Sequence, residues 1–260
     1  MSEQADYSML DRPEILQFIF YPRSDFQEGP SNSVDYFVSV GDGIGISCRI
    51  YIYSKSAPTV IYFHGNGEVV SDYNYVAPTY NEIGINLLVV DYRGYGASGG
   101  KPMFVDMTSD AHVVFETLRD ILHHDEYTGD FFVMGRSLGS ISAIEVACNY
   151  HHNINGLILE SAFGSIIKMM AYAGLTGLKE IKDLDFPNLK NIRKISVPTL
   201  ILHGELDNLI PVSEAKSLFK NSAAKDKRLV FIPNAGHNDI MLVGMEQYFC
   251  EVREFVFKGK

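Results

Sequence analysis

Short apolar runs alternate with longer amphipathic stretches along this chain, and this alternation constrains the fold more than any other feature. Several runs are continuously apolar, which indicates strands that are buried on both faces of a sheet. Strands that alternate with helical stretches predict a parallel sheet with crossover helices. The runs that we interpret as central strands are Thr59–Phe63, Ile85–Val90, Phe131–Met134 and Leu157–Leu159.

Further segments extend this sheet to eight predicted strands. Ser33–Val40 and Ile44–Tyr53 are rich in β-branched and aromatic residues, and Gly41-Asp42-Gly43 lies between them. Such a glycine-rich turn predicts an antiparallel hairpin. Thr199–Leu202 and Leu229–Ile232 complete the series. We therefore predict an α/β fold with an eight-stranded, mostly parallel sheet flanked by helices.

Helices are predicted where apolar residues recur at helical spacing. Residues 162–197 separate two strands by more than a crossover helix requires, and we expect a helix with a short, cap-like excursion there. Since the chain has 260 residues, we expect a single domain over residues 1–260. The predicted helices are Asp106–His123, Leu138–Tyr150, Ser213–Phe219 with Ser213 as its N-cap, and Asp239–Phe257.

Composition excludes several classes of partner. The formal net charge is −10, which argues against binding to nucleic acid or to an anionic membrane surface. No apolar run approaches the roughly 20 residues of a membrane helix, and the N-terminus has no secretory pattern, so we expect a cytoplasmic protein. The three cysteines match no metal motif, and we expect buried thiols in a reducing compartment.

A candidate nucleophile lies directly after one central strand. The segment Gly135-Arg136-Ser137-Leu138-Gly139 follows Phe131–Met134 and precedes a predicted helix. A nucleophile at such a sharp turn has a strained backbone and an outward-facing hydroxyl, and the flanking glycines avoid clashes between strand and helix. The order strand, Gly-x-Ser-x-Gly, helix therefore predicts Ser137 as a nucleophile. A plain glycine-rich turn is the alternative.

A serine hydroxyl needs a base held close by, and the base needs an acid that orients it. His237 follows the last predicted strand, and Asp207 follows the strand before it. We predict His237 as the base and Asp207 as the acid, with Glu205 and Asp239 as competitors for the acid position. The chain order Ser, Asp, His is the one found in α/β hydrolases.

A tetrahedral intermediate needs backbone N–H donors for its oxyanion. We expect one donor from Leu138, the residue after the nucleophile. The loop Phe63-His64-Gly65-Asn66-Gly67 follows a strand, and its glycines allow a close approach of the substrate, so Asn66 N–H is the expected second donor. His64 is expected to support this loop. The loop also suits phosphate, but no Gly-Lys-Ser/Thr pattern accompanies it.

An apolar acyl group needs apolar surface near the nucleophile. The excursion offers Met169, Met170, Tyr172 and Leu175, and methionine adapts to varied ligand shapes. The alternative is that these side chains only pack their helix onto the sheet. Glu160 lies at the end of a predicted strand. It either pairs with Arg136, assists the acid of the triad, or is an ordinary surface carboxylate.

Together these motifs resemble the α/β-hydrolase family over about Val60 to Asp239. They are most similar to a subgroup of small esterases, thioesterases and depalmitoylase-like enzymes. The resemblance implies hydrolysis of a small-molecule acyl ester or thioester without metal or organic cofactor. A small serine peptidase or aminopeptidase and a non-catalytic binding protein are the alternatives. The motifs are His64-Gly65-Asn66-Gly67, Asp91-Tyr92-Arg93-Gly94-Tyr95-Gly96-x-Ser98, Gly135-Arg136-Ser137-Leu138-Gly139, His203-Gly204-x-x-Asp207 and Gly236-His237-Asn238-Asp239.

Overall fold

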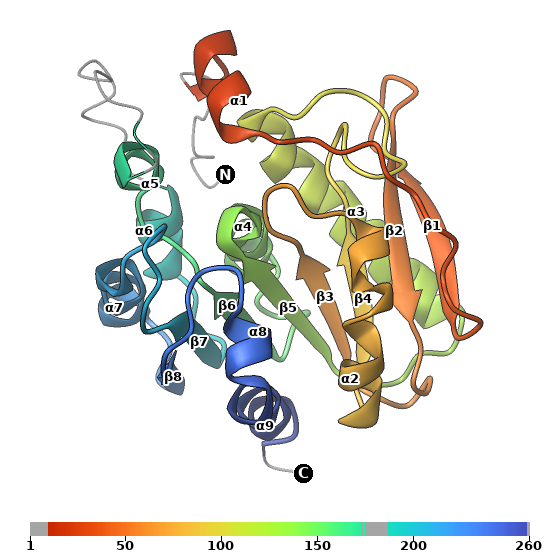
Figure 1. Cartoon of the computed structure of the whole chain (residues 1–260). Helices are drawn as coiled ribbons and strands as arrows, with labels where there is room; N and C mark the ends of the chain where they lie inside the picture. Colours follow the sequence, from red (N-terminus) through yellow and green to blue (C-terminus); the bar gives the residue numbers. More distant parts are fainter. Residues whose placement is uncertain (1–9, 173, 175–186, 259–260) are drawn as a thin grey trace.

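The computed structural model describes residues 10–172, 174 and 187–258, which form one eight-stranded sheet (Figure 1). The strand order across the sheet is β1-β2-β4-β3-β5-β6-β7-β8. The strands are β1 Ser33–Ser39, β2 Gly45–Tyr51, β3 Thr59–Phe63, β4 Asn86–Val90, β5 Phe131–Arg136, β6 Gly156–Glu160, β7 Thr199–Gly204 and β8 Lys227–Ile232.

Strand directions follow from the connections along the chain. The β1–β2 hairpin is antiparallel, and β2 also pairs with β4 in antiparallel register. The pairs from β4 through β3, β5, β6 and β7 to β8 are all parallel, because each returns through a helical crossover. The predicted eight-stranded, mostly parallel α/β sheet is confirmed.

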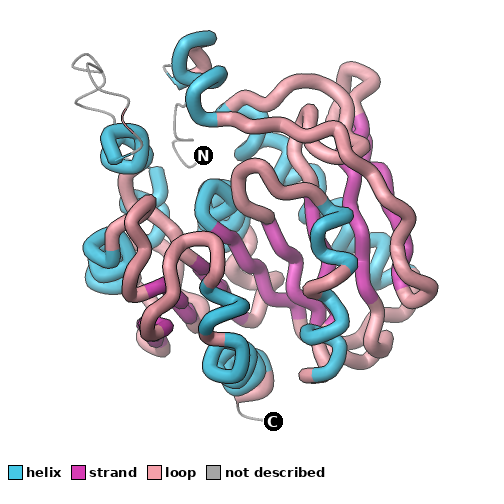
Figure 2. Tube along the Cα trace, in the orientation of Figure 1, coloured by secondary structure: helices cyan, strands magenta, loops and turns pink. Residues whose placement is uncertain are grey.

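Helices cover both faces of the sheet, and Figure 2 shows how they alternate with the strands along the chain. Successive strand residues point to opposite faces, so Ile61 and Phe63 pack with α3 and α4, whereas Val60 and Tyr62 pack with α2 and α9. The helices are α1 Pro13–Ile19, α2 Ala77–Glu82, α3 Phe104–His124, α4 Ser140–Asn149, α5 Ile166–Tyr172, α6 Pro187–Ile192, α7 Val212–Asn221, α8 Ile240–Val243 and α9 Met245–Val256, with 3₁₀ turns η2 Val70–Asn74 and η3 Ser137–Gly139.

The four helix predictions differ from the structure by one or two residues at their ends. Helix α7 begins at Val212 with Pro211 as its N-cap, so Ser213 lies inside the helix. The predicted C-terminal helix is divided at Gly244 into α8 and α9. Two short helices, α1 and α2, were not predicted, because a helix of seven or six residues gives too short a periodic pattern.

The expectation of three buried cysteines is wrong in part. Cys48 is buried, Cys148 is half-buried and Cys250 is exposed. Cys250 lies on the solvent side of α9, whose neighbouring residues Phe249 and Val252 supply the buried face. Within the 162–197 excursion, α5 and α6 are described, whereas 173 and 175–186, with Leu175, lie outside the described residues. The single domain over 1–260 stays a prediction.

Candidate active site

The turn after β5 has the geometry expected of a nucleophile elbow. Ser137 has a backbone φ of 50°, a left-handed conformation that costs a residue with a side chain roughly 1–2 kcal/mol. A Cβ atom at Gly135 would meet Ala143 of α4, and one at Gly139 would meet the carbonyl oxygens at the end of β3. Glycine at both positions lets strand and helix approach closely while Ser137 projects from the carboxyl end of the sheet.

The structure brings together the three residues predicted as nucleophile, base and acid. Ser137 Oγ lies 3.0 Å from His237 Nε2, and His237 Nδ1 lies 2.7 Å from Asp207 Oδ2. All three residues are buried, with exposed fractions of 8%, 8% and 6%. With the ring proton on Nδ1, His237 donates to Asp207 and accepts the hydrogen bond of the Ser137 hydroxyl.

The loop after β7 presents Asp207 as a charged acceptor. Its other oxygen, Oδ1, accepts the backbone N–H groups of Leu209 and Ile210 at 3.0 and 2.7 Å. Burial raises the pKa of Asp207, but the hydrogen bond and charge of His237 outweigh burial, and the pKa lies below its ordinary value. His203 supports the same loop, since its Nε2 donates to the carbonyl oxygen of Ile210 at 2.8 Å.

The two competitors for the acid position lie elsewhere. Glu205 is exposed, and no hydrogen bond to His237 is found for it among the described residues. Asp239 Oδ1 accepts the backbone N–H of Gly236 at 2.6 Å, so its carboxylate stabilises the turn that carries His237. Among the described carboxylates, Asp207 is therefore the one placed against the imidazole.

The loop after β3 lies beside the nucleophile and is held by polar contacts. His64 Nδ1 bonds to the carbonyl oxygen of Gly65 at 2.8 Å, and its Nε2 lies 3.1 Å from Asp91 Oδ1. Glu68 Oε2 accepts the Gly65 N–H at 2.7 Å. Asn66 lines the same cavity as Ser137 and Leu138. These contacts place both residues predicted as oxyanion donors at the nucleophile.

A buried ionic network lies behind the site and was not predicted as a unit. Arg136 donates through Nε to Glu160 Oε1 at 3.1 Å, through Nη1 to Glu68 Oε1, and through Nη2 to the His237 carbonyl oxygen at 2.9 Å. Glu160 is fully buried and also accepts the Tyr248 hydroxyl at 2.7 Å. Of the three readings of Glu160, the structure therefore shows the pairing with Arg136 and excludes a surface carboxylate.

Burial and the charge of Arg136 shift the pKa values of the two carboxyl groups in this network, Glu160 and Glu68, in opposite directions. Burial raises the pKa of Glu160, and although Arg136 opposes this, the pKa stays above its ordinary value. Burial also raises the pKa of Glu68, but there the charge of Arg136 wins and the pKa is lowered. The sequence indicated one pair of this network, because Glu160 at the end of a predicted strand was considered as a partner of Arg136.

A cavity of about 320 Å³ opens at Ser137. One side is formed by Phe163, Leu209 and Ile210 and by Met169 of α5. Of the three residues predicted to bind substrate, Met169 lines this cavity. Met170 is fully buried in the core, and Tyr172 is 43% exposed on α5.

Part of the cavity lining comes from a segment that was not predicted to contribute. Phe18, Ile19 and Tyr21, in and after α1, line it. The sequence signal was weak: Pro13 in the first turn of α1, followed by the spaced apolar residues Ile15 and Ile19.

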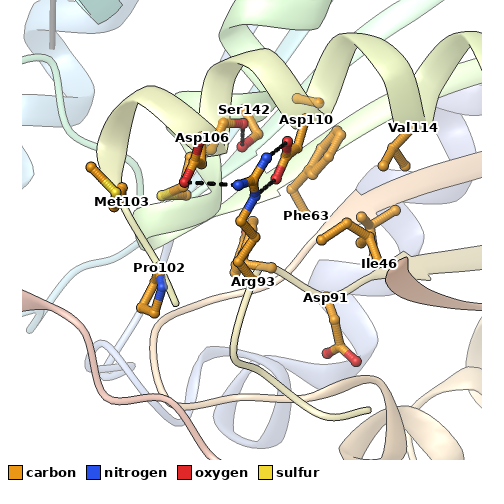
Figure 3. A pocket seen from close by; sticks show the side chains of 14 residues that line it. Ile46, Phe63, Asp91, Arg93, Pro102, Met103, Asp106, Asp110, Val114 and Ser142 are labelled. Atoms are coloured by element: carbon orange, nitrogen blue, oxygen red, sulfur yellow. Dashed lines mark hydrogen bonds and ion pairs between the residues drawn. The ribbon is translucent and has the colours of Figure 1, made fainter. Parts of the chain in front are cut away.

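A second, much smaller cavity lies against α3 (Figure 3). Its volume of about 10 Å³ has room for no more than one water molecule. Arg93 points from its loop toward α3, where its Nε bonds to Asp110 Oδ2 at 2.7 Å and its Nη1 lies 3.3 Å from Asp106 Oδ2 (Figure 3). The Asp91–Gly96 motif is therefore a structural turn tied to α3.

Metal-ligating side chains are not clustered in the described part of the chain. No group of three or more His, Cys, Asp or Glu side chains there could hold a metal ion. No helix among residues 10–172, 174 and 187–258 is long and apolar enough to cross a membrane.

Known proteins share this fold and this sequence pattern. A family model described as "Serine aminopeptidase, S33" matches residues 54–191 and 188–241. Human alpha/beta hydrolase domain-containing protein 17B is 29% identical over 243 residues, which cover 90% of this chain and 80% of that protein. Arabidopsis thaliana WAV2, another alpha/beta hydrolase domain-containing protein, is 29% identical over 218 residues, covering 77% and 70%.

Solved structures agree on the fold. The Pyrococcus furiosus esterase Pf2001 superposes with a TM-score of 0.75 at 22% identity, covering 91% of this chain and 98% of that one. Est1E from Butyrivibrio proteoclasticus with bound ferulic acid gives a TM-score of 0.70 at 23% identity, covering 85% and 97%. Since the family model matches most of the chain, this protein belongs to the serine aminopeptidase S33 family of α/β hydrolases and is a hydrolase.

Proposed function

We propose that this hydrolase cleaves small carboxylic esters or thioesters through an acyl-enzyme formed on Ser137. His237 takes the Ser137 proton as the hydroxyl attacks the acyl carbonyl, and then donates it to the leaving group. Water, activated by the same imidazole, releases the acid and restores the serine. Asp207 keeps the imidazole in the required tautomer and stabilises the imidazolium.

One observation carries this proposal. A continuous hydrogen-bond chain runs from Ser137 Oγ through His237 to Asp207, with distances of 3.0 and 2.7 Å, both within the range that proton transfer requires. A structural serine at a turn has no need of a base that is itself oriented by a buried carboxylate. A non-catalytic binding protein would have no reason to keep all three groups in hydrogen-bonding contact.

The oxyanion is proposed to bind the backbone N–H groups of Leu138 and Asn66. Leu138 is the second residue of η3, and the N–H groups of a first helical turn have no partner within the helix. Asn66 lies across the same cavity. Two such donors supply several kcal/mol of stabilisation when the tetrahedral intermediate forms.

The cavity favours an acyl group over a peptide amine. Recognition of a substrate ammonium group calls for a carboxylate near the nucleophile, because a buried charge must be paired. The described residues that line the cavity include no acidic side chain, and most of them are apolar. This observation supports an ester or thioester and argues against an aminopeptidase. A cytoplasmic location stays a prediction from the sequence.

A direct test compares substrate classes on one preparation. We expect turnover of p-nitrophenyl esters or acyl-CoA thioesters, and no turnover of aminoacyl nitroanilides. A fluorophosphonate probe should label the protein, and Ser137→Ala should abolish both labelling and turnover, since losing a triad nucleophile costs about 10⁴- to 10⁶-fold in kcat. An alanine variant that keeps more than about a tenth of the activity would exclude Ser137 as nucleophile.

A further inference from the structure

The segment before the sheet forms one wall of the active-site cavity. We call residues 10–23 the N-terminal arm; it contains α1 and crosses the carboxyl end of the central strands (Figure 1, red, at the top). Three residues of the arm, Phe18, Ile19 and Tyr21, line the same cavity as Ser137 and Met169. The arm and the excursion after β6 therefore both contribute to the wall of the cavity at Ser137.

The arm is fixed to the fold at its beginning and in its middle. Asp11 accepts the backbone N–H groups of Phe104 and Val105 at 2.6 and 3.1 Å, at the start of α3. The rings of Phe20 and Phe104 pack with centroids 4.9 Å apart. Ile15 is fully buried in the core. These contacts anchor the arm to the start of α3 and to the core.

The arm is also clasped to the loop that is proposed to bind the oxyanion. Asn66 Oδ1 accepts the Tyr21 N–H at 3.0 Å and the Tyr95 hydroxyl at 2.7 Å, while Asn66 Nδ2 donates to the Ile19 carbonyl oxygen. Tyr95 Oη accepts the Tyr21 N–H as well, at 3.1 Å. We call these contacts the Asn66–Tyr95 clasp.

A second contact of the arm reaches the same loop. Arg23 Nη1 donates to the Gly67 carbonyl oxygen at 3.0 Å and to Asp72 at 2.8 Å. Gly67 has a φ of 76°, and a Cβ atom there would approach Tyr21. The backbone of the loop therefore passes directly under the arm, and a shift of either segment moves the other.

We propose that the N-terminal arm determines which acyl groups this enzyme accepts. Phe18 contacts the acyl chain. The Asn66–Tyr95 clasp holds the arm in position relative to the oxyanion site. The inference rests on the proposed function. Phe18 is half-buried, and it lines a cavity whose other described lining residues are mostly apolar. An apolar acyl group suits this lining, because most of the residues around it are apolar.

The test compares an octanoate with an acetate p-nitrophenyl ester and uses the ratio of their kcat/KM values. Phe18→Ala should lower this ratio about tenfold, because the outer methylenes lose their apolar contact. Tyr95→Phe removes only the hydroxyl of the clasp, and should raise KM for the octanoate ester about two- to tenfold with a smaller effect on acetate. Phe26→Ala is the matched control, since Phe26 follows the arm, is 47% exposed and does not line the cavity.

The outcomes separate the two proposals. If the wild type hydrolyses both esters and the Phe18→Ala ratio equals or exceeds that of Phe26→Ala, the arm inference is overturned and the proposed function stands. If the wild type hydrolyses only acyl-CoA thioesters, the same ratio is measured on octanoyl- and acetyl-CoA. If it hydrolyses neither these esters nor these thioesters, the proposed function fails. The arm inference is then tested by calorimetric binding of octyl 4-nitrophenyl ether, which Phe18→Ala should weaken about tenfold and Phe26→Ala should not. If Tyr95→Phe does not fold, Phe18→Ala decides the question alone.

Discussion

Replacing Arg136 by methionine is the sharpest test of the buried network behind the site. Methionine keeps much of the apolar volume but removes the charge between Glu160 and Glu68, to both of which Arg136 donates. Glu160 is fully buried, so its carboxylate would lose its cation without gaining water. Breaking a buried pair in this way costs about 3–5 kcal/mol of unfolding free energy. Urea denaturation at neutral pH, with midpoints and slopes compared, measures the loss.

A double substitution separates this charge effect from lost packing. Arg136→Met with Glu160→Gln removes both charges. The Tyr248 hydroxyl, which now donates to Glu160, can donate to the amide oxygen that replaces this carboxylate. We expect the double variant to lose about 1–3 kcal/mol less than the sum of the two single losses, since contacting residues couple by that amount. Additive losses would refute the assignment of Arg136 and Glu160 as a coupled pair.

The same variant should depend on pH in a defined direction. Burial already raises the pKa of Glu160, and loss of Arg136 raises it further. A carboxyl group whose pKa is raised by folding stabilises the folded state at pH values below the pKa that it has in the unfolded chain. This stabilisation is lost as the pH rises through the pKa that the group has in the folded state. The stability deficit of Arg136→Met should therefore be larger at about pH 8 than at about pH 5. An equal deficit at both pH values would contradict a buried ionised Glu160.

Three further outcomes are expected from the candidate active site. Asp207→Asn should leave the fold intact and lower kcat by about 10⁴, whereas Glu205→Gln and Asp239→Asn should be much milder; a greater loss at either would move the acid role there. Gly65→Val should cost roughly 10² to 10³ in kcat, because a Cβ atom at Gly65 meets Arg136 and Glu68, and near-wild-type activity would place the oxyanion site elsewhere. On p-nitrophenyl esters, kcat/KM should peak between about four and eight carbons, since each covered methylene adds about 0.8 kcal/mol; a steady rise to sixteen carbons or strong interfacial activation would indicate a deep channel.

The fold was predictable because the central strands are continuously apolar. Thr59–Phe63 was placed with both ends correct, and the other strands differ by one or two residues at their ends. The Gly-x-Ser-x-Gly turn was predictable for a related reason, because an apolar strand, a serine between two glycines and a helical stretch follow one another around Ser137. Local pattern and tertiary structure support each other in these segments.

The parts that were missed depend on contacts between distant segments. The N-terminal arm has one short helix, and its role arises from Asn66, about 45 residues away. The partners of Arg136 lie 68, 24 and 101 residues along the chain. Hydrogen bonds of this kind leave no periodicity in the sequence. The contribution of Met169 to the cavity, in contrast to the burial of Met170, likewise depends on how α5 is rotated on the sheet.

The position of β8 has a consequence for how the enzyme loses activity. This strand lies at the edge of the sheet, and among the described strands it pairs with β7 alone. Five of its six residues are only half-buried. His237 lies in the loop that follows this strand, so fraying of this edge would carry the imidazole away from Ser137 while the central strands remain folded. Local openings of exposed edges require less free energy than global unfolding. Thermal inactivation is therefore expected to begin while amide hydrogens of β3 and β5 are still protected from exchange.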